Sequence, residues 1–298
     1  MMDSSNTIYQ AKGILPGITD IQIQTLVTGG SGFLGQALIE RLISMGRKNI
    51  VSMSRNEGEA VALKQRFPQV QVIIGDICNP WDVKRAMMCA DEVFHLSALK
   101  HVGLAEAQVQ ACVNTNILGT MNVINESLIT KPKVLVFISS DKASQPNGVY
   151  GCSKKIGEKL MEEAERSNPD TKYRVVRYGN VLMSTGSVLC KWKDKILAGE
   201  EIIVTDVEST RFYWPVSQAV DLIFNSIKYG HGAAPIVTGM KSIRLGDLLE
   251  AMFEKYGQVP VKVIGLQNGE NMHEVIAEGI PDSFHSERFT KEEIYELI

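Results

Sequence analysis

The chain has 298 residues, 44% of them hydrophobic, and a formal net charge of −3 at pH 7. This length can bury the core of one large domain, or of a domain with a smaller lobe. No apolar run approaches the roughly 18 residues of a membrane span, and scattered charges leave no extended basic face for nucleic acid. The five cysteines include no C-x-x-C pair, which indicates reduced thiols and no metal site. We therefore expect a cytoplasmic protein that binds neither membranes nor nucleic acid.

A glycine-rich loop follows the first predicted strand. Residues 1–20 lack clear periodicity and are expected to form an N-terminal extension. Residues 21–27 predict a strand and residues 36–45 predict an amphipathic helix, with glycines between them in a three-residue spacing. This spacing permits a tight turn and a close approach to a pyrophosphate at the helix N-terminus. The predicted cofactor contacts in this loop are Gly29, Ser31, Gly32, Phe33 and Leu34.

The end of the second strand indicates which dinucleotide binds. The strand predicted at residues 50–53 ends in Ser54 and Arg55, and no carboxylate stands there for a ribose 2′-hydroxyl. Arginine at this point suits a 2′-phosphate and favours NADP over NAD. An ordinary exposed arginine in a turn is the alternative interpretation.

A second strand–helix unit leads to the adenine side of the predicted site. After a helix at residues 57–66 and a strand at residues 70–74, Asp76 could bond the adenine amine, with Ile77 beside it. Three strand–helix units in succession predict a parallel sheet with right-handed crossovers.

The strand predicted at residues 92–96 ends in small residues. Leu96 and Ser97 would form a floor for the cofactor, and Lys100 is a candidate contact to cofactor or sugar. A solvated lysine at a strand end is the other interpretation of Lys100.

Residues 104–128 predict one long helix across a face of the sheet. Asn114 and Asn116 are able to bond the backbone where this helix bends, and we favour a structural role for both.

Polar side chains with complementary chemistry follow the next predicted strand. Ser140 closes the strand, and Asp141 and Lys142 place an acid and a base beside it. Tyr150 and Lys154 stand four residues apart and lie on one face of a helix, where the ammonium can lower the pKa of the phenol. A tyrosine so placed can take a proton from a sugar hydroxyl, which Ser140 could also bond. Tyr-x-x-x-Lys is common on helix surfaces, but its neighbours favour the catalytic interpretation.

The remaining segments divide between the sheet and a lobe. Residues 134–137 and 173–177 predict strands, and residues 150–166 predict a helix. Shorter segments are typical of a substrate lobe that partly returns to the sheet; they are residues 186–199, 201–205, 216–229, 245–256 and 261–264. We expect an α/β fold, with a Rossmann-like doubly wound parallel sheet at residues 21–183 and a smaller C-terminal substrate lobe at residues 184–298.

The sequence resembles the extended short-chain dehydrogenase/reductase superfamily in its glycine loop, in Asp76 and in Tyr150-x-x-x-Lys154. More narrowly, it is similar to the inverting UDP-N-acetylglucosamine 4,6-dehydratases of glycan synthesis. The segments that carry this closer match are Ala98-Leu-Lys-His-Val102, Ser139-Ser-Asp-Lys-Ala143, Val176-Arg-Tyr-Gly-Asn-Val181, Gly186-Ser-Val188, Thr210-Arg-Phe212 and Gly269-Glu-Asn-Met-His-Glu274. The glycine loop is shared with the whole superfamily, whereas Asp-Lys after the serine is far more restrictive.

The resemblance implies an NADP-dependent lyase that removes water from a UDP-sugar. Tyr150 would deprotonate the 4-hydroxyl during oxidation at C-4 by tightly held NADP. Lys142 would then take the C-5 proton while Asp141 protonates the departing 6-hydroxyl, or these two roles could be reversed. Hydride return to C-6 and protonation of the opposite face of C-5 would give UDP-2-acetamido-2,6-dideoxy-L-arabino-hex-4-ulose.

The resemblance also implies which residues bind. The catalytic set is Ser140, Asp141, Lys142, Tyr150 and Lys154, of which Tyr150 and Lys154 also contact the cofactor. The implied substrate contacts are Lys100, Asn180, Val181, Arg211 and Glu270. We interpret His273, in the same segment as Glu270, as structural in preference to catalytic.

Two positions depart from the family pattern. Ser140 stands where the family has threonine, a change that keeps the hydroxyl. Gln267 and Asn268 stand where the family has Arg-Pro, which removes a cation expected near the nucleotide diphosphate. The cations that would have to compensate are Arg211, Arg244 or one of Lys191, Lys193 and Lys195.

Three alternatives stay open. A C-5-retaining dehydratase would use the same residues, whereas a UDP-sugar 4-epimerase has no need of Asp141 and Lys142. A non-catalytic NADP-binding regulator could lose Tyr150 or Lys154, and both are present. In the resembling family the two long helices beside the sheet pair between subunits, so we expect a homo-oligomer of at least two chains.

Overall fold

The computed structural model describes residues 23–184 and 186–298, so the extension predicted at residues 1–20 lies outside the described residues. Seven parallel strands form the central sheet in the order β10-β6-β5-β4-β1-β2-β3. Their bounds are β1 (Gln24–Thr28), β2 (Asn49–Ser54), β3 (Gln71–Ile74), β4 (Glu92–His95), β5 (Val134–Ile138), β6 (Lys172–Val176) and β10 (Pro235–Ile236). The strand order reverses between β1 and β4, which confirms the predicted Rossmann-like doubly wound class.

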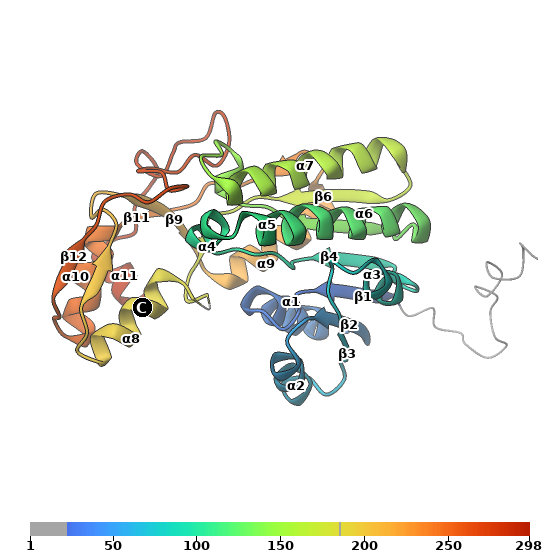
Figure 1. Ribbon diagram of the computed structural model, residues 1–298, viewed down its shortest axis with the longest axis horizontal. Coiled ribbons are helices and arrows are strands. Elements are labelled where there is room, and N and C mark those ends of the chain that lie inside the picture. The colour runs from blue at the N-terminus through green and yellow to red at the C-terminus, as the bar shows by residue number, and fades with distance from the viewer. Residues whose placement is uncertain (1–22, 185) are drawn as a thin grey trace, which may run out of the picture.

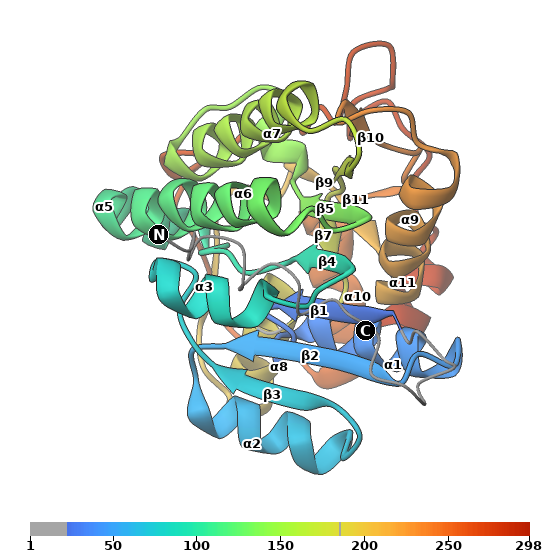
Figure 2. The ribbon, with the colours of Figure 1, turned by 90° about the vertical axis from the view of Figure 1, so that its right-hand side faces the viewer.

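Helices cover both faces of this sheet (Figure 2). One face carries α1 (Phe33–Ser44) and α9 (Val216–Tyr229). The other face carries α3 (Pro80–Met87), α6 (Gly119–Thr130) and α7 (Val149–Ser167), while α2 (Glu57–Arg66) packs against the outer strand β3. Because α9 and β10 belong to this body, part of the C-terminal half of the chain returns to the sheet.

The central strands bury side chains on both faces, which is why they read as continuous apolar runs. All five residues of β5 are buried. Val136 of β5 belongs to the hydrophobic layer that includes Leu38 of α1. Its neighbour Leu135 belongs to the opposite layer, which includes Met161 of α7. The carboxyl end of β5 is therefore held from both sides.

The prediction of one continuous helix at residues 104–128 is wrong. The segment consists of α4 (Val102–Ala107), α5 (Val109–Cys112), a π-helical segment η2 (Val113–Leu118) and α6. At Gln108 the backbone leaves helical geometry, with φ −129° and ψ 62°. Within η2, Asn116 turns inward and bonds other segments instead of solvent, so the irregular turns position this side chain.

A smaller lobe lies beyond the carboxyl ends of the strands, at the left of Figure 1. Its strands are β7 (Asn180–Val181), β9 (Thr210–Trp214) and β11 (Ser242–Arg244) in one sheet, and β8 (Ile202–Val204) and β12 (Val261–Val263) in another. Its helices are α8 (Val188–Leu197), α10 (Leu245–Tyr256) and α11 (Lys291–Leu297), around a hydrophobic cluster of their own. The lobe therefore faces the strand ends where a ligand binds in this fold class.

Candidate active site

A cavity of about 750 Å³ lies where the strand ends of the sheet meet the C-terminal lobe. This volume is in the usual range for a small-molecule site. Its walls contain every site residue predicted from the sequence except Asp76. The predicted residues that line it are Gly29, Ser31, Gly32, Phe33, Leu34, Ser54, Arg55, Ile77, Leu96, Ser97, Lys100, Ser140, Asp141, Lys142, Tyr150, Lys154, Asn180, Val181, Arg211 and Glu270.

The glycine loop forms one wall of the cavity. Gly29 has a φ of +72°, and a Cβ there would lie 3.0 Å from the backbone nitrogen of Ser97. A Cβ on Gly35 would lie 2.6 Å from the Cα of Gly30, so no side chain fits. Helix α1 begins after Gly32 with no side-chain cap and no acidic residue in its first turn. The helix start therefore offers its backbone N–H groups to an anion, as a dinucleotide pyrophosphate requires.

The carboxylate of Asp76, the predicted adenine contact, already contacts other groups of the protein. Its Oδ1 accepts the backbone N–H of Cys78 at 2.9 Å, and its Oδ2 lies 3.8 Å from Nη1 of Arg55. A carboxylate that does line the cavity is that of Glu59, which accepts the Ser31 hydroxyl at 2.9 Å. The sequence prediction misses Glu59, because a ribose-binding carboxylate is expected at the end of β2 and Glu59 lies in the first turn of α2.

The floor of the cavity is fixed by Asn116. Its Oδ1 accepts the backbone N–H of Leu99 at 2.8 Å, and its Nδ2 donates to the carbonyl of Leu99 at 2.9 Å. The same Nδ2 donates to Oγ of Ser153, next to Lys154, at 3.0 Å. The favoured structural role of Asn116 is confirmed, since it ties the segment that contains Lys100 to the start of α7.

Ser140 and Asp141 close β5 with a hydrogen-bonded turn. The turn is the short 3₁₀ segment η3 (Asp141–Ala143), and Ser140 caps it. Oδ1 of Asp141 accepts the Ser140 hydroxyl and the backbone N–H of Lys142, both at 2.8 Å, whereas its buried Oδ2 has no partner among the described residues. Burial raises the pKa of Asp141, and the Glu274 charge adds to that rise against the effects of Lys142 and Ser140. Asp141 is therefore suited to carry a proton.

Tyr150 and Lys154 lie in the first turns of α7, as predicted, but their electrostatics differ from the prediction. Nζ of Lys154 donates to the carbonyl of Ile138 at 2.8 Å and lies 4.8 Å from the ring centre of Phe137. Burial lowers the pKa of Lys154 to about 8. Burial raises the pKa of Tyr150, and the hydrogen bond of Ser140 only partly opposes it. The net pKa of Tyr150 is therefore raised and not lowered as expected, because desolvation of the phenol outweighs the effects that oppose it.

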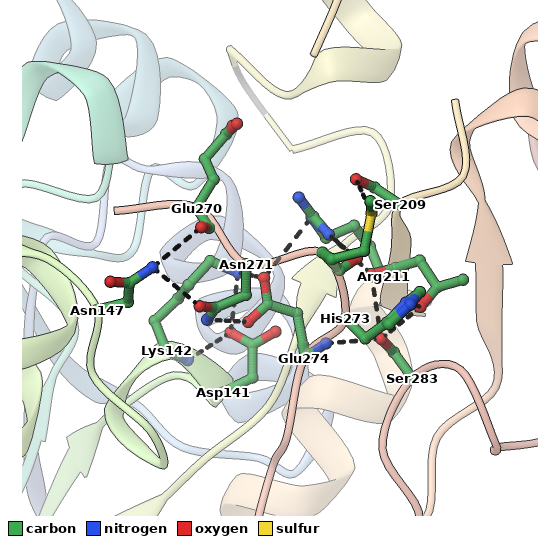
Figure 3. A network of polar contacts seen from close by, with 12 residues as sticks. Asp141, Lys142, Asn147, Ser209, Arg211, Glu270, Asn271, His273, Glu274 and Ser283 are labelled. Atoms are coloured by element: carbon green, nitrogen blue, oxygen red, sulfur yellow. Dashed lines mark hydrogen bonds and ion pairs between the residues drawn. The ribbon is translucent and has the colours of Figure 1, made fainter. Parts of the chain in front are cut away.

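Lys142 and Arg211 meet a carboxylate from the far end of the chain. Figure 3 shows Lys142 directed at Glu274, with Asn271 beside them. The Lys142 Nζ lies 2.6 Å from Oε1 of Glu274 and 3.7 Å from Oδ1 of Asp141. Nε of Arg211 lies 3.7 Å from the same Oε1. The prediction of site residues omits Glu274, because only its position in space, and no local pattern, links it to Lys142.

The segment around Glu270 also contacts the loop before α7. The Glu270 carbonyl accepts Nδ2 of Asn147 at 3.1 Å, and Glu270 itself lines the cavity. His273 does not line the cavity; its Nδ1 lies 2.8 Å from the Thr210 hydroxyl, and its ring packs on Phe284 at 4.8 Å. These contacts agree with the structural interpretation of His273.

The cations that could replace the missing arginine have different surroundings. Nζ of Lys191 lies 2.7 Å from Nε2 of His101, and both line a second cavity of about 430 Å³ beside the first. Lys193 instead lies over the ring of Tyr256 at 4.7 Å. Arg244 is ion-paired with Glu208 and Asp247. Arg211 lines the main cavity and Lys191 the second one, whereas neither Lys193 nor Arg244 lines either cavity.

Within residues 23–184 and 186–298, no helix is long and apolar enough to cross a membrane. In the same ranges no His, Cys, Asp and Glu side chains gather as a group of three or more that could hold a metal ion.

Comparison with curated proteins finds relatives over most of the chain. An uncharacterized membrane protein of Methanocaldococcus jannaschii is 34% identical over 284 residues, covering 91% of this chain and 82% of that protein. An inverting UDP-N-acetylglucosamine 4,6-dehydratase of Campylobacter jejuni is 32% identical over 257 residues, covering 84% and 76%. A UDP-glucose 4-epimerase of Rickettsia rickettsii is 31% identical over 258 residues, with the same two coverages of 84% and 76%.

Comparison with solved structures and family models agrees with this. Pen from Bacillus thuringiensis superposes with a TM-score of 0.87 at 30% identity, covering 94% of this chain and 98% of that one. The family model described as "Polysaccharide biosynthesis protein" matches residues 25–295. Since this match spans nearly all described residues, the resemblance inferred from the motifs is confirmed, and the chain belongs to the polysaccharide biosynthesis protein family.

Proposed function

We propose that the protein is a nucleotide-sugar 4,6-dehydratase that converts UDP-N-acetylglucosamine, with inversion at C-5, to UDP-2-acetamido-2,6-dideoxy-L-arabino-hex-4-ulose. The observation that carries this proposal is the presence of Asp141 and Lys142 in the same cavity as Ser140, Tyr150 and Lys154. Oxidation at C-4 needs only the last three residues, whereas elimination of water needs an additional acid and base. The 32% identical dehydratase of Campylobacter jejuni supports the same reaction.

The residues present fit a nicotinamide dinucleotide, and we propose NADP. The cradle of Gly29 and Gly32 would hold the pyrophosphate at the start of α1, and Ser54 and Arg55 would hold a 2′-phosphate. When bound, the oxidised nicotinamide supplies a hydride acceptor for C-4 and later returns that hydride to C-6.

Tyr150 is the proposed base of the first step. It takes the proton of the sugar 4-hydroxyl, while the Ser140 hydroxyl bonds the same oxygen. The raised pKa of Tyr150 makes this step dependent on positive charge beside the phenol. Lys154 lies four residues away on the same helix face and can provide that charge.

Asp141 and Lys142 carry the elimination. The 4-ketone acidifies C-5, Lys142 takes the C-5 proton, and the C-5–C-6 double bond forms as the bond to the 6-oxygen breaks. Asp141 gives its proton to that oxygen, so water leaves. Its raised pKa and unpartnered Oδ2 support the acid role for Asp141 and the base role for Lys142. Protonation of the opposite face of C-5 then gives the L-sugar.

The UDP part would lie toward the lobe. Arg211 and the Lys191–His101 pair supply positive charge for the diphosphate, which compensates for Gln267 and Asn268. The remaining proposed substrate contacts line the same cavity; they are Lys100, Asn180, Val181 and Glu270.

The test is incubation of the purified protein with NADP and UDP-N-acetylglucosamine, followed by mass spectrometry and NMR. We expect a product lighter by one water with L configuration at C-5. A dehydrated product with the D configuration would indicate a retaining dehydratase. No reaction with any UDP-sugar, despite dinucleotide binding, would favour the non-catalytic regulator.

A second candidate is a UDP-sugar 4-epimerase, because the Rickettsia rickettsii relative at 31% identity has that name. An epimerase would give a product of unchanged mass with the 4-hydroxyl inverted, so the same measurement separates the two reactions. Asp141 and Lys142 would then be dispensable.

A further inference from the structure

Glu274 is a buried carboxylate behind the cavity, and its Oε1 faces both Lys142 and Arg211. It is 1% exposed and does not line the cavity itself. Its Oε1 accepts Nζ of Lys142 at 2.6 Å, and its Oε2 accepts Nδ2 of Asn271 at 3.2 Å. Its backbone N–H donates to the Ser283 hydroxyl at 2.7 Å, which fixes the segment (Figure 3).

The surroundings make Glu274 an anion. Burial alone would raise the pKa of Glu274, but the charges of Lys142 and Arg211, with the hydrogen bonds of Lys142 and Asn271, together lower it. A carboxylate in this state stabilises an ammonium on its neighbour more than it stabilises a neutral amine.

Lys142 is the closer partner of the two cations. The Arg211 guanidinium already donates to the carbonyls of Thr210 and Met272, at 2.9 and 3.0 Å, and lies 3.7 Å from Glu274. Lys142 lies 2.6 Å from Glu274 and lines the cavity directly beside Asp141.

We propose that Glu274 is a positioning residue that aims Lys142 Nζ at the substrate and stabilises the ammonium formed when Lys142 takes the C-5 proton. This inference rests on the function proposed above. In that step Lys142 acts as the neutral amine, which its ammonium becomes on losing a proton to water. The C-5–H bond breaks, a new N–H bond forms on Lys142, and the electron pair left at C-5 forms the double bond as the 6-hydroxyl leaves with the Asp141 proton. Glu274 keeps its own protonation state throughout. The same division of work between a base and a supporting carboxylate is known from His–Asp pairs.

The test separates the two half-reactions in Glu274→Gln, which removes the charge at nearly constant shape. Formation of reduced nicotinamide after mixing with UDP-N-acetylglucosamine reports oxidation at C-4. Solvent deuterium entering C-5 and release of water report elimination. We expect elimination to slow by about tenfold to a hundredfold, since one charge-assisted hydrogen bond is lost. Oxidation should change by less than about twofold, so reduced nicotinamide accumulates.

The matched control is Glu278→Gln, an exposed carboxylate on the same segment, and both half-reactions should remain as in the unmodified protein.

The outcomes are distinguishable. Equal slowing of oxidation and elimination, or an unchanged elimination rate, would overturn the inference and leave the proposed function standing. If the unmodified protein releases no water from any UDP-sugar, the proposed function fails and the inference falls with it. If Glu274→Gln does not fold, Glu274→Asp decides, because it keeps the charge on a shorter side chain: selective slowing of elimination supports the inference, and equal slowing of both steps contradicts it.

Discussion

Replacement of Arg55 by alanine should remove most of the preference for NADP over NAD. In the structure the Arg55 side chain is 61% exposed and lies 3.8 Å from Asp76, so turning it to a phosphate breaks one exposed ion pair. Such a pair contributes at most about 1 kcal/mol. A charge-assisted bond to the 2′-phosphate contributes about 1.5 to 3 kcal/mol. The difference between these two contributions is the expected preference for NADP over NAD, about 2 kcal/mol near the middle of the range. It corresponds to roughly a thirtyfold ratio of the two affinities.

Glu59 opposes this preference. Its carboxylate lines the same end of the cavity on the Ser31 hydroxyl, and its negative charge repels a 2′-phosphate. Glu59→Gln should therefore widen the ratio of NADP to NAD affinity by about twofold to fivefold, as expected for one exposed charge pair. Arg55→Ala and Glu59→Gln thus shift the ratio in opposite directions.

Titration calorimetry on cofactor-free protein measures both ratios. The matched control is Arg66→Ala, which removes another exposed arginine, one in α2 that bonds Gln36 and Glu40 and does not line the cavity. Its ratio should equal that of the unmodified protein. Equal affinities for NADP and NAD in the unmodified protein, or an unchanged ratio in Arg55→Ala, would show that the 2′-phosphate binds elsewhere or not at all.

Four further predictions concern chemistry, stability and assembly. Lys142→Ala should keep NADP affinity but lose elimination, and near-normal turnover measured by mass spectrometry would exclude Lys142 from the mechanism. Tyr150→Phe should give no absorbance of reduced nicotinamide after mixing with substrate, whereas a normal transient would remove its role as base. Arg177→Ala should lower the free energy of unfolding in urea by about 3 to 5 kcal/mol, because the buried Glu158 carboxylate loses the guanidinium that it contacts at 2.7 Å and keeps only the Ser139 hydroxyl and Lys155; a loss below about 1 kcal/mol would contradict this. Light scattering at micromolar concentration should give at least a dimer, because apolar side chains on the outer sides of α6 and α7, such as Ile129 and Ile156, are exposed in the single chain, and a monomer would refute the assembly.

The parts of the site that the sequence predicts well are those in which function and local conformation share one short segment. Gly29, Gly32 and Gly35 determine both the turn and the anion site. Tyr150 and Lys154 meet because they are four residues apart in a helix, which local spacing alone specifies. Such patterns need no knowledge of the tertiary fold.

The parts of the site and fold that the sequence does not predict depend on tertiary contacts. Glu274 reaches Lys142 from an irregular segment, and Glu59 enters the cavity because α2 packs beside the glycine loop. The π-helical turn places Asn116 so that it bonds Leu99 and Ser153, which are tertiary contacts that the helical periodicity of residues 104–128 does not reveal. The pKa of Tyr150 depends on how fully the folded chain removes water from the phenol, which spacing does not reveal.

The short helix α3 shows a third reason why the sequence does not predict every element: a helix can be too short for hydrophobic periodicity to reveal it. It has eight residues, Pro80–Met87, so its apolar positions are too few to define a period, although Asn79 and Pro80 mark its start. A cap and a proline at N1 identify such a helix more reliably than periodicity does.

The ion pair between Lys142 and Glu274 also has a consequence for biosynthesis. The N-terminus of the chain leaves the ribosome first during synthesis, and domains fold largely in that order. The glycine loop and the catalytic turn emerge first, and the sheet is complete only after α9 and β10, at residues 216–236. Glu274 emerges later still, so a nascent chain can form its dinucleotide cradle before Lys142 gains Glu274 as a partner. Under the proposed function, a chain that stalls before residue 274 would hold the cofactor but lack the carboxylate that supports elimination.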